Sequence, residues 1–421
     1  MKYRLLNYLV CPDCGGDLKI SVFKENRARD AYTGKVKRCE EVCAFKAHSD
    51  GTSSKGVECG ACYSFEIEAG LLSCKCNNIY PIADGIARML PDAFHDLGGF
   101  IEAYGGFLPL GKVESSINGG SVQHSVSLQK KTKESFGYQW LRYNVNDERE
   151  DRKIFLSDSQ LSGESLNDKM VLDAGCGMGR YTSIAAGMAR EIIGLDISRS
   201  ILKAYDKTKK NPSAHIIQGD ILNLPFREKQ FDVIYSLGVL HHTPDPRQAF
   251  LNLTQCLKEE GIISVWLYGS AGRFSDFKTN PLRRERKRYV NSNFAKRVHW
   301  LIVSLREIVY NAIRLVTARM YVPLLYLLCY PLAALGKVPL LKYFTASVHR
   351  NWRVRLQENF DWFSPQYQSH HTKEEVRGWF DAGHVEVVSL LEHGFIPKVG
   401  VKGRLKRQQS TKLHKPGLKD C

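Results

Sequence analysis

Several marks of exported and membrane-spanning proteins are missing from this sequence of 421 residues. Its first ten residues lack the apolar core and the small-residue cleavage site of a secretory signal. Residues 320–336 carry no charge, but this stretch is at the lower limit of what spans a bilayer, and Pro323 and Pro331 interrupt it. Internal repeats and low-complexity tracts are also absent. We therefore expect a cytoplasmic protein without a plain transmembrane helix.

The charge of the chain is concentrated in two segments. The composition is ordinary for a globular protein, with 43% hydrophobic and 25% charged residues, but the formal net charge is +16. Residues 281–359 hold fifteen Lys/Arg against three Glu, and residues 402–421 hold seven Lys/Arg against one Asp. The rest of the chain is close to neutral. This distribution indicates an anionic partner for particular segments.

Eight of the twelve cysteines precede residue 77, which predicts metal binding because no export signal favours disulfides. They are Cys11, Cys14, Cys39, Cys43, Cys59, Cys62, Cys74 and Cys76. The simplest assignment has an outer zinc site of Cys11, Cys14, Cys74 and Cys76 and a second, inner site of Cys39, Cys43, Cys59 and Cys62. A single site of Cys11, Cys14, Cys59 and Cys62 is equally economical. We expect the zinc to be structural, in a module of residues 1–94 that is too short of apolar periodicity for a large core.

Residues 165–268 alternate strand-like apolar runs with helix-like stretches, which is typical of βαβ units and a parallel sheet. The pattern predicts strands at 169–174, 192–196, 215–218, 231–237 and 262–267, with helices at 181–189 and 200–209. Two further strands at 385–391 and 398–401 are expected to pair antiparallel across a turn at 392–394. The predicted fold is α/β, with a doubly wound, mainly parallel seven-stranded sheet.

A glycine-rich turn follows the first of these strands and opens a helix. It reads Asp173-Ala174-Gly175-Cys176-Gly177-Met178-Gly179. Small residues let a ligand approach the backbone, and the helix N-terminus offers free N–H groups. The Gly-x-Gly-x-Gly spacing differs from that of pyrophosphate-binding loops, and Asp173 would repel a pyrophosphate but attract an ammonium group. The pattern therefore favours a nucleoside ligand that carries an amine.

Acidic residues end the next two strands, at the edge where parallel sheets bind ligands. Asp196 is placed to accept hydrogen bonds from both ribose hydroxyls, and Ile197 follows it. Asp220 is placed to accept from an adenine amino group, with Ile221 against the ring. Leu237 ends the fourth strand at the same edge.

These motifs resemble, in order and spacing, the class I S-adenosylmethionine-dependent methyltransferases, in the branch of the ubiquinone and menaquinone methyltransferases. The resemblance covers about residues 165–268. It implies that Asp173, Gly175, Gly177, Asp196 and Asp220 bind S-adenosylmethionine; the predicted cofactor set also includes Cys176, Gly179, Ile197, Ile221 and Leu237. Cys176 is a small loop residue of the family type rather than a nucleophile.

His241 and His242 follow the fourth strand, where the methyl acceptor would approach. One of them acts as the catalytic base or orients the acceptor, or both only hold the loop by hydrogen bonds; the sequence does not separate the two residues. The loop lacks the Asn/Asp-Pro-Pro-Tyr/Phe pattern of methyltransferases that act on amino groups of adenine or glutamine, and no cysteine stands ready for attack on pyrimidine C5. These absences leave O- or C-methylation of a smaller acceptor.

The N-terminal module resembles the small zinc-ribbon proteins that activate tRNA and translation-factor methyltransferases, over residues 1–20 and 71–90. It departs from them at Cys74-x-Cys76, where two intervening residues are usual, which makes Cys76 the firmer ligand. Residues 95–145 are expected to be a connector, in which 135–140 (Ser-Phe-Gly-Tyr-Gln-Trp) covers the cofactor as an aromatic lid or simply packs on the domain.

The remaining boundaries place the methyltransferase domain at 146–270 plus 365–405, a basic, apolar helical insertion at 271–364, and a basic tail at 406–421. The insertion is interpreted as a lid over the active site, as a peripheral patch on an anionic membrane through 281–360, or, less favoured, as a nucleic-acid-binding surface. A small-molecule or lipid-linked acceptor suits the first two. The alternatives to this function are an RNA methyltransferase and a non-catalytic, donor-binding activator protein.

Overall fold

The computed structural model describes residues 1–27, 43–49, 61–118, 123–145, 147–270, 274, 293–338, 345–347, 349–391 and 398–407. The predicted inner cysteines Cys39 and Cys59, the 392–394 turn, the arginine-rich start of the insertion and most of the basic tail lie outside these residues.

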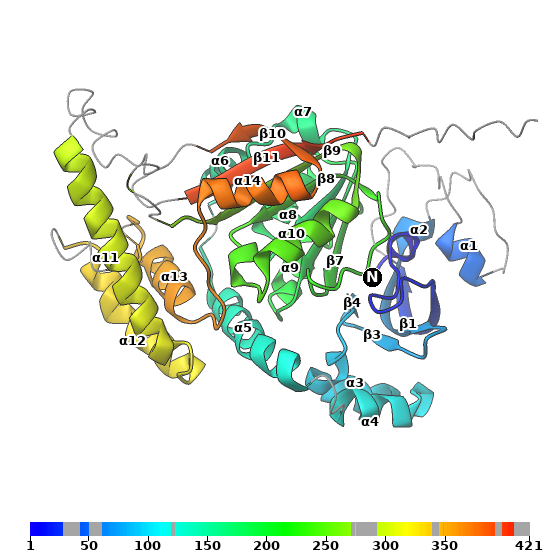
Figure 1. The fold of residues 1–421 in the computed structure, drawn as a ribbon. Helices are drawn as coiled ribbons and strands as arrows, with labels where there is room; N and C mark the ends of the chain where they lie inside the picture. The colour runs from blue at the N-terminus through cyan, green and yellow to red at the C-terminus, as the bar shows by residue number, and fades with distance from the viewer. Residues whose placement is uncertain are drawn as a thin grey trace, which may run out of the picture.

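The centre of the molecule is a twisted sheet with helices on both faces (Figure 1). Its central strands are β5 (Met170–Ala174), β6 (Glu191–Asp196), β7 (Ala214–Gln218), β8 (Phe231–Leu237) and β9 (Leu257–Tyr268). They pair in parallel in the order β7-β6-β5-β8-β9. β11 (Lys398–Leu405) pairs antiparallel with β9 and with β10 (Val385–Leu390). The predicted α/β fold and the antiparallel pairing of the last two strands are therefore confirmed.

The sheet is larger than the seven strands that the sequence predicts. β1 (Leu18–Arg27), β2 (Phe65–Cys74), β3 (Ile79–Ala83) and β4 (Ile86–Arg88) form an antiparallel N-terminal extension. β4 pairs in parallel with β7, with Ala87 opposite Ile217 and Arg88 opposite Gln218. The eleven strands form one sheet in the described structure.

Residues 1–94, which the sequence predicts to be too short of apolar periodicity for a large core, bury their apolar side chains together with those of the central sheet. Leu5, Ile67 and Ile82 are buried and belong to the same apolar cluster as Ile193 and Ile217 of the central strands. The cysteine-rich module therefore shares a core with the central sheet instead of standing alone, because its own small apolar surface is completed by the edge of that sheet.

Helices cover both faces of the central sheet because the strands are apolar on both sides. One face packs against α10 (Pro246–Gln255) and α14 (Lys373–Ala382). The other packs against α6 (Glu148–Ser159), α7 (Gly163–Leu166), α8 (Arg180–Ala186) and α9 (Ile201–Thr208).

Several short helices of the N-terminal module and the connector precede one long helix. They are η1 (Tyr3–Asn7), α1 (Ala44–Ser49), α2 (Ala61–Ser64), η2 (Ala93–Asp96), α3 (Gly98–Tyr104), η3 (Gly105–Phe107) and α4 (Leu110–Asn118). The long helix α5 (Gln123–Arg142) runs from the N-terminal region to the central domain (Figure 1). The connector is thus largely helical where it is described.

The insertion is helical, as expected, and lies on the side of the molecule away from the N-terminal module (Figure 1). It consists of α11 (Asn293–Thr317), α12 (Val322–Leu335) and α13 (Trp352–Phe363). Its core of Tyr310, Leu325, Cys329, Leu356 and Phe360 is separate from the clusters of the sheet. None of the described helices is both long and apolar enough to cross a bilayer.

Candidate functional site

The loop between β5 and α8 can only be built from glycine at its key positions. Gly175, Gly177 and Gly179 have φ angles of 90°, 52° and 77°, which side chains rarely adopt. A Cβ atom at Gly175 would lie 2.4 Å from Val239 Cγ1, and one at Gly179 would lie 2.8 Å from Ala204 Cα. The backbone of the loop therefore packs tightly against Val239 and Ala204, which leaves no room for side chains at Gly175 and Gly179.

Asp196 ends β6 beside this loop. The Gly177 N–H donates to Asp196 Oδ2 at 2.9 Å, while the Ser198 N–H and hydroxyl donate to Oδ1 at 2.8 and 2.7 Å. Burial raises the pKa of Asp196 above its ordinary value, although these donors oppose the shift. The carboxylate is thus held rigidly between the glycine loop and the start of α9.

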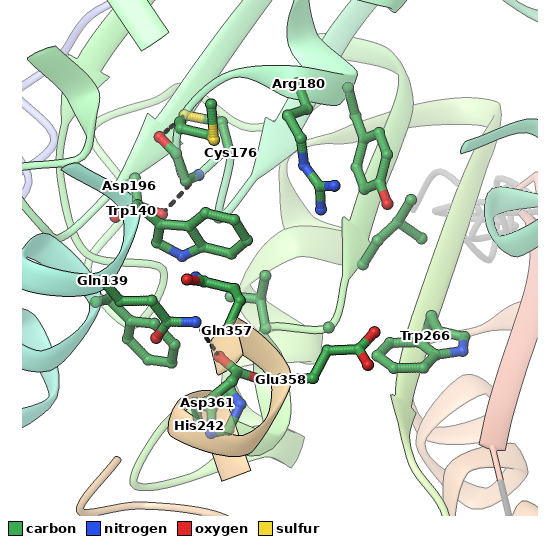
Figure 2. Close-up of a pocket in the computed structure, with 18 of the residues that line it drawn as sticks. Gln139, Trp140, Cys176, Arg180, Asp196, His242, Trp266, Gln357, Glu358 and Asp361 are labelled. Atoms are coloured by element: carbon green, nitrogen blue, oxygen red, sulfur yellow. Dashed lines mark hydrogen bonds between the residues drawn. The ribbon is translucent and has the colours of Figure 1, made fainter. Parts of the chain in front are cut away.

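A cavity of about 700 Å³ lies along the carboxyl ends of the parallel strands (Figure 2). This volume is within the usual range of small-molecule sites. The predicted cofactor residues that line it are Gly175, Cys176, Gly177, Asp196, Ile197, Asp220, Ile221 and Leu237. The structure therefore brings together eight of the ten predicted residues from four strand ends.

Asp173 and Gly179 do not line the cavity. The Asp173 side chain is buried behind the loop, where its Oδ2 accepts a hydrogen bond from the Thr182 hydroxyl at 2.6 Å. Burial raises the pKa of Asp173 to about 7. In this arrangement Asp173 fixes the first turn of α8, and direct contact with a ligand ammonium stays a prediction.

The Cys176 side chain is buried next to β6, since a Cβ atom at Gly194 would lie 3.1 Å from its sulfur. Burial, reinforced by the charge of Asp196, raises the pKa of the Cys176 thiol well above its usual value. A thiol that stays protonated is a poor nucleophile, which supports the interpretation of Cys176 as a small loop residue.

His241 and His242, which the sequence leaves equivalent, have different surroundings. The His241 ring is fully buried, stacks on Tyr268 at 3.9 Å between centroids, and its Nδ1 accepts from the Tyr268 N–H at 3.3 Å. His241 is not among the residues that line the cavity. Burial lowers its pKa well below the usual value. His241 therefore packs against Tyr268 outside the lining of the cavity, and its role as a base stays a prediction.

His242 lines the cavity, with its ring 5.1 Å from that of Phe136. Its Nδ1 lies 3.1 Å from the Tyr367 carbonyl, an acceptor, so Nδ1 must carry the proton. Nε2 then has the lone pair, and this atom has no hydrogen-bond partner among the described residues. Burial lowers the pKa of His242, which keeps the ring neutral near pH 7.

The insertion contributes carboxylates that the sequence analysis missed. Glu358 and Asp361 of α13 line the cavity, and Glu358 points toward its centre (Figure 2). Asp361 Oδ2 accepts from the Tyr268 hydroxyl at 2.7 Å, and Oδ1 accepts from Gln139 Nε2 at 3.2 Å. Their spacing of three residues places both on one helix face, and this was the signal available in the sequence.

The wall of the cavity is acidic and aromatic. Eight carboxylates line it against three Lys/Arg residues. Two of these cations are committed to neighbouring acids, since Arg180 lies 3.0 Å from Asp151 and Lys398 lies 3.9 Å from Asp158. The aromatic side chains that line it are Phe136, Trp140, Tyr143, Tyr181, Trp266, Tyr268, Trp362 and Tyr367. Phe136 and Trp140 come from the predicted lid segment, here part of α5. The cavity suits a flat or hydroxylated ligand better than a polyanion.

Four cysteine sulfurs converge in the N-terminal module. Those of Cys11, Cys14, Cys74 and Cys76 all lie within 4.8 Å of one another. Sulfur pairs are separated by 3.6 Å (Cys11–Cys76) and 3.3 Å (Cys14–Cys74). Tetrahedral zinc with Zn–S bonds of about 2.3 Å places its sulfurs about 3.8 Å apart, so the donor set fits this metal. The structure therefore groups the cysteines of the predicted outer site.

The predicted inner site is described only in part. The buried Cys43 and Cys62 sulfurs are 3.7 Å apart, while Cys39 and Cys59 lie outside the described residues. Cys62 lies beside Cys43, while Cys11 and Cys14 group with Cys74 and Cys76, which favours the nested arrangement over a single site of Cys11, Cys14, Cys59 and Cys62.

Two family models match separate parts of the chain. Residues 172–265 match the methyltransferase domain family, and residues 2–85 match the Trm112p-like protein family. The first match contains the glycine loop, Asp196, Asp220 and the histidine pair; the second contains the four-sulfur cluster and reaches the end of β3.

Curated relatives match about a quarter of the chain. The demethylmenaquinone methyltransferase of Staphylococcus haemolyticus is 35% identical over 96 residues, which are 22% of this chain and 40% of the relative. The tRNA (carboxymethyluridine(34)-5-O)-methyltransferase of Arabidopsis thaliana is 34% identical over 110 residues, 24% of this chain and 26% of the relative. The chain therefore spans less than half the length of these relatives.

A solved structure with both kinds of module is also similar. It is the complex of the Trm112 methyltransferase activator of Haloferax volcanii with a protein assigned as a methyltransferase. The alignment covers 66% of this chain and 99% of that one, at 11% identity and a TM-score of 0.37.

Proposed function

We propose that this chain, which carries a methyltransferase domain behind a Trm112p-like domain, is an S-adenosylmethionine-dependent methyltransferase that acts on an oxygen or carbon atom of a small or lipid-linked acceptor. The observation that carries the proposal is the continuous cavity from the glycine loop and Asp196 to His242 and Asp361. One end presents the groups that a nucleoside requires, and the other presents a base and hydrogen-bonding carboxylates.

The donor end fits S-adenosylmethionine by the chemistry of its residues. Asp196 would accept hydrogen bonds from the ribose hydroxyls and Asp220 would accept from the adenine amino group, with Ile221 against the ring; Ile197 and Leu237 line the same cavity. When bound, S-adenosylmethionine supplies an electrophilic methyl group on a sulfonium. The open glycine loop lets the ligand approach the backbone at the start of α8.

The acceptor end performs positioning and proton removal. His242 Nε2 accepts the proton of an acceptor hydroxyl or acidic C–H, because Nδ1 is committed to the Tyr367 carbonyl and Nε2 has the free lone pair. Asp361, held from two sides by Tyr268 and Gln139, accepts a hydrogen bond from a second acceptor group. Most of the rate then arises from the alignment of acceptor and methyl group.

The acidic wall favours a neutral, hydroxylated and aromatic-stacking acceptor over RNA. Eight carboxylates line the cavity against three Lys/Arg residues, and two of these cations lie beside neighbouring acids, so a phosphate that enters meets an excess of acidic groups. RNA remains the second candidate, because the Arabidopsis relative is a tRNA methyltransferase and the chain carries a net charge of +16.

We also propose that the sulfurs of Cys11, Cys14, Cys74 and Cys76 hold a structural zinc ion. The metal would tie the loop of Cys11 and Cys14 to the end of β2 and the turn that follows it. Because β2 pairs with β3 and β3 with β4, this tie stabilises the part of the sheet that joins β7.

Isothermal titration with S-adenosylmethionine tests the donor site. We expect micromolar binding by the wild type, its loss in Asp196→Ala, and its retention in Asp206→Ala, an exposed carboxylate of α9. Labelled donor is then offered with phenolic, sugar-lipid and tRNA acceptors. Methylation of tRNA alone would overturn the acceptor class. Donor binding without turnover on any acceptor would favour the activator alternative, and no binding by a folded, zinc-loaded protein would contradict the central proposal.

A further inference from the structure

The outer surface of α11 and α12 is apolar although it faces away from the protein. Its exposed large side chains include Leu301, Leu305, Ile308, Leu315, Val316 and Leu327, each 57–67% exposed. Figure 1 shows both helices at the periphery, with α13 between them and the central domain. We call this surface the outer face of α11 and α12. An exposed apolar area of this extent marks an interaction site.

The charged residues of α11 that follow Arg297 point inward. Arg314 is buried and donates to the Pro365 carbonyl at 2.9 Å, and the half-buried Arg306 donates to the Thr345 carbonyl at 2.9 Å. Glu307 accepts from the Ser270 hydroxyl at 3.2 Å. Between Arg297 and Arg319, no exposed position of α11 carries a charge. This distribution is the reverse of that of a water-facing helix and suits a helix whose outer side meets hydrocarbon.

Cations border the outer face. Arg297, Arg319 and Lys337 are exposed at the ends of the two helices, and Glu307 is the single acidic residue in the sequence from 293 to 338. Tyr321 in the turn between the helices is 73% exposed, and Tyr330 is 44% exposed. Tyrosines and cations around an apolar centre match the depth profile of a lipid headgroup region.

We infer that the outer face of α11 and α12 is the surface by which this protein lies on an anionic membrane. The helices would be embedded in one leaflet parallel to its plane, since no described helix is fit to cross it. A second copy of the chain suits the face less well, because a symmetric contact would oppose the cationic borders of the two copies. A bilayer with anionic headgroups neutralises these borders and buries the apolar centre.

The helices α11, α12 and α13 link the proposed membrane surface to the cavity. α13 packs on α11 and α12 through Tyr310, Leu325 and Phe360, and its other side provides Glu358 and Asp361. A lipid-linked acceptor could therefore present its headgroup to His242 while its chain stays in the bilayer. This second step rests on the proposed function, whereas membrane binding itself does not require S-adenosylmethionine or turnover.

Co-sedimentation of the full chain with vesicles tests the inference. We expect binding to phosphatidylcholine vesicles with 30 mol% phosphatidylglycerol, and weaker binding to pure phosphatidylcholine or at high salt, since the cationic borders are screened. The variant Leu305→Asp/Ile308→Asp should lower the partition coefficient by on the order of tenfold or more for each side chain. Val388→Asp, at an equally exposed valine of β10, is the matched control and should bind as the wild type does.

Thermal denaturation and S-adenosylmethionine titration establish that both variants are folded, because neither site touches the cavity. Absence of wild-type binding to anionic vesicles would overturn the inference, as would wild-type binding by Leu305→Asp/Ile308→Asp. If the wild type does not bind vesicles but is a dimer in sedimentation velocity, and Leu305→Asp/Ile308→Asp is a monomer, the face would be assigned to a second copy instead. Vesicle binding by a protein that lacks methyltransferase activity would leave the membrane inference standing and reject the proposed function.

Discussion

Replacement of Arg4 by methionine should destabilise the whole protein, because Arg4 neutralises a buried carboxylate at the junction of the N-terminal module and the central sheet. Glu191, at the start of β6, is fully buried. Its Oε1 and Oε2 each lie 3.1 Å from a guanidinium nitrogen of Arg4, and Oε1 also accepts from the Tyr63 hydroxyl at 3.2 Å. Tyr8 donates to Oε2 as well. Arg4 and Glu191 are 187 positions apart in the sequence.

The expected loss is about 3–5 kcal/mol at pH 7, the usual cost of removing one partner of a buried ion pair. Methionine retains much of the apolar stem of Arg4, so the loss measures the stranded charge rather than a cavity. Lys24→Met is the matched control, because Lys24 forms an exposed ion pair with Glu68 at 3.0 Å. Such a pair contributes about 0–1 kcal/mol.

The loss should depend on pH. Although burial favours the neutral acid, the hydrogen bond of His215 and the charge of Arg4 hold the pKa of Glu191 well below its usual range. A group with a lowered pKa stabilises the fold above the unfolded pKa of about 4.3 and loses this contribution as the pH falls through the folded value. Without Arg4 the pKa of Glu191 in the folded protein rises, because the charge of Arg4 no longer offsets the effect of burial. The deficit of Arg4→Met relative to wild type is then largest at neutral pH and shrinks toward pH 5.

Urea denaturation followed by tryptophan fluorescence, at pH 7.5 and 5.5, measures these differences. Arg4→Met/Glu191→Gln should recover part of the loss at pH 7.5, since the stranded charge is gone. The reasoning is refuted if Arg4→Met costs no more than Lys24→Met, or if the second substitution recovers nothing at either pH.

Three further predictions concern the cavity and the metal. His242→Ala should lower kcat by roughly 10²- to 10⁴-fold with little change in donor affinity, and a variant as active as the wild type would exclude His242 as the base. In the wild type, steady-state pH profiles should show a kcat/KM that is flat near pH 7 and falls only on acidification through the lowered pKa of His242. Gly175→Ala should abolish donor binding in calorimetry, because its Cβ would lie 2.4 Å from Val239 Cγ1 at a φ of 90°, and intact binding would mean that the loop shifts freely. Cys11→Ser/Cys76→Ser should lower the zinc content by one equivalent in elemental analysis and lower the Tm, whereas unchanged zinc would assign the metal to other ligands.

The central strands were predictable because each contains an apolar run and either ends in aspartate or is followed directly by glycine. The predicted strand 231–237 coincides with β8, and 192–196 differs from β6 by one residue. The last parallel strand was predicted at 262–267, but β9 starts at Leu257. The sequence 258–260 is Lys-Glu-Glu, with Glu260 at a φ of 61°, so this part of the strand has neither the apolar pattern nor the regular backbone of the remainder.

Long-range features were not predictable from local pattern. β4 has three residues, too few for a period, and its partner β7 is far away in the sequence. His241 and His242 are adjacent and chemically identical, and only the positions of Tyr268 and the Tyr367 carbonyl distinguish them. Likewise, the apolar period of α11 indicated a helix with one apolar side, but not that this side faces outward.

Because β4 pairs with β7, the N-terminal module can complete its native contacts only after β7 has been synthesised. Arg88 leaves the ribosome 130 residues before Gln218, with which its side chain forms a hydrogen bond. At about 5–20 residues per second, the module waits on the order of ten seconds for its partner strand. During this interval the backbone edge of β4 and the apolar side chains of Ile82 and Ile86 have no native cover, and another nascent chain can pair with them. Overproduction should therefore aggregate the nascent protein more readily than slow synthesis at low temperature, even when the finished chain is stable.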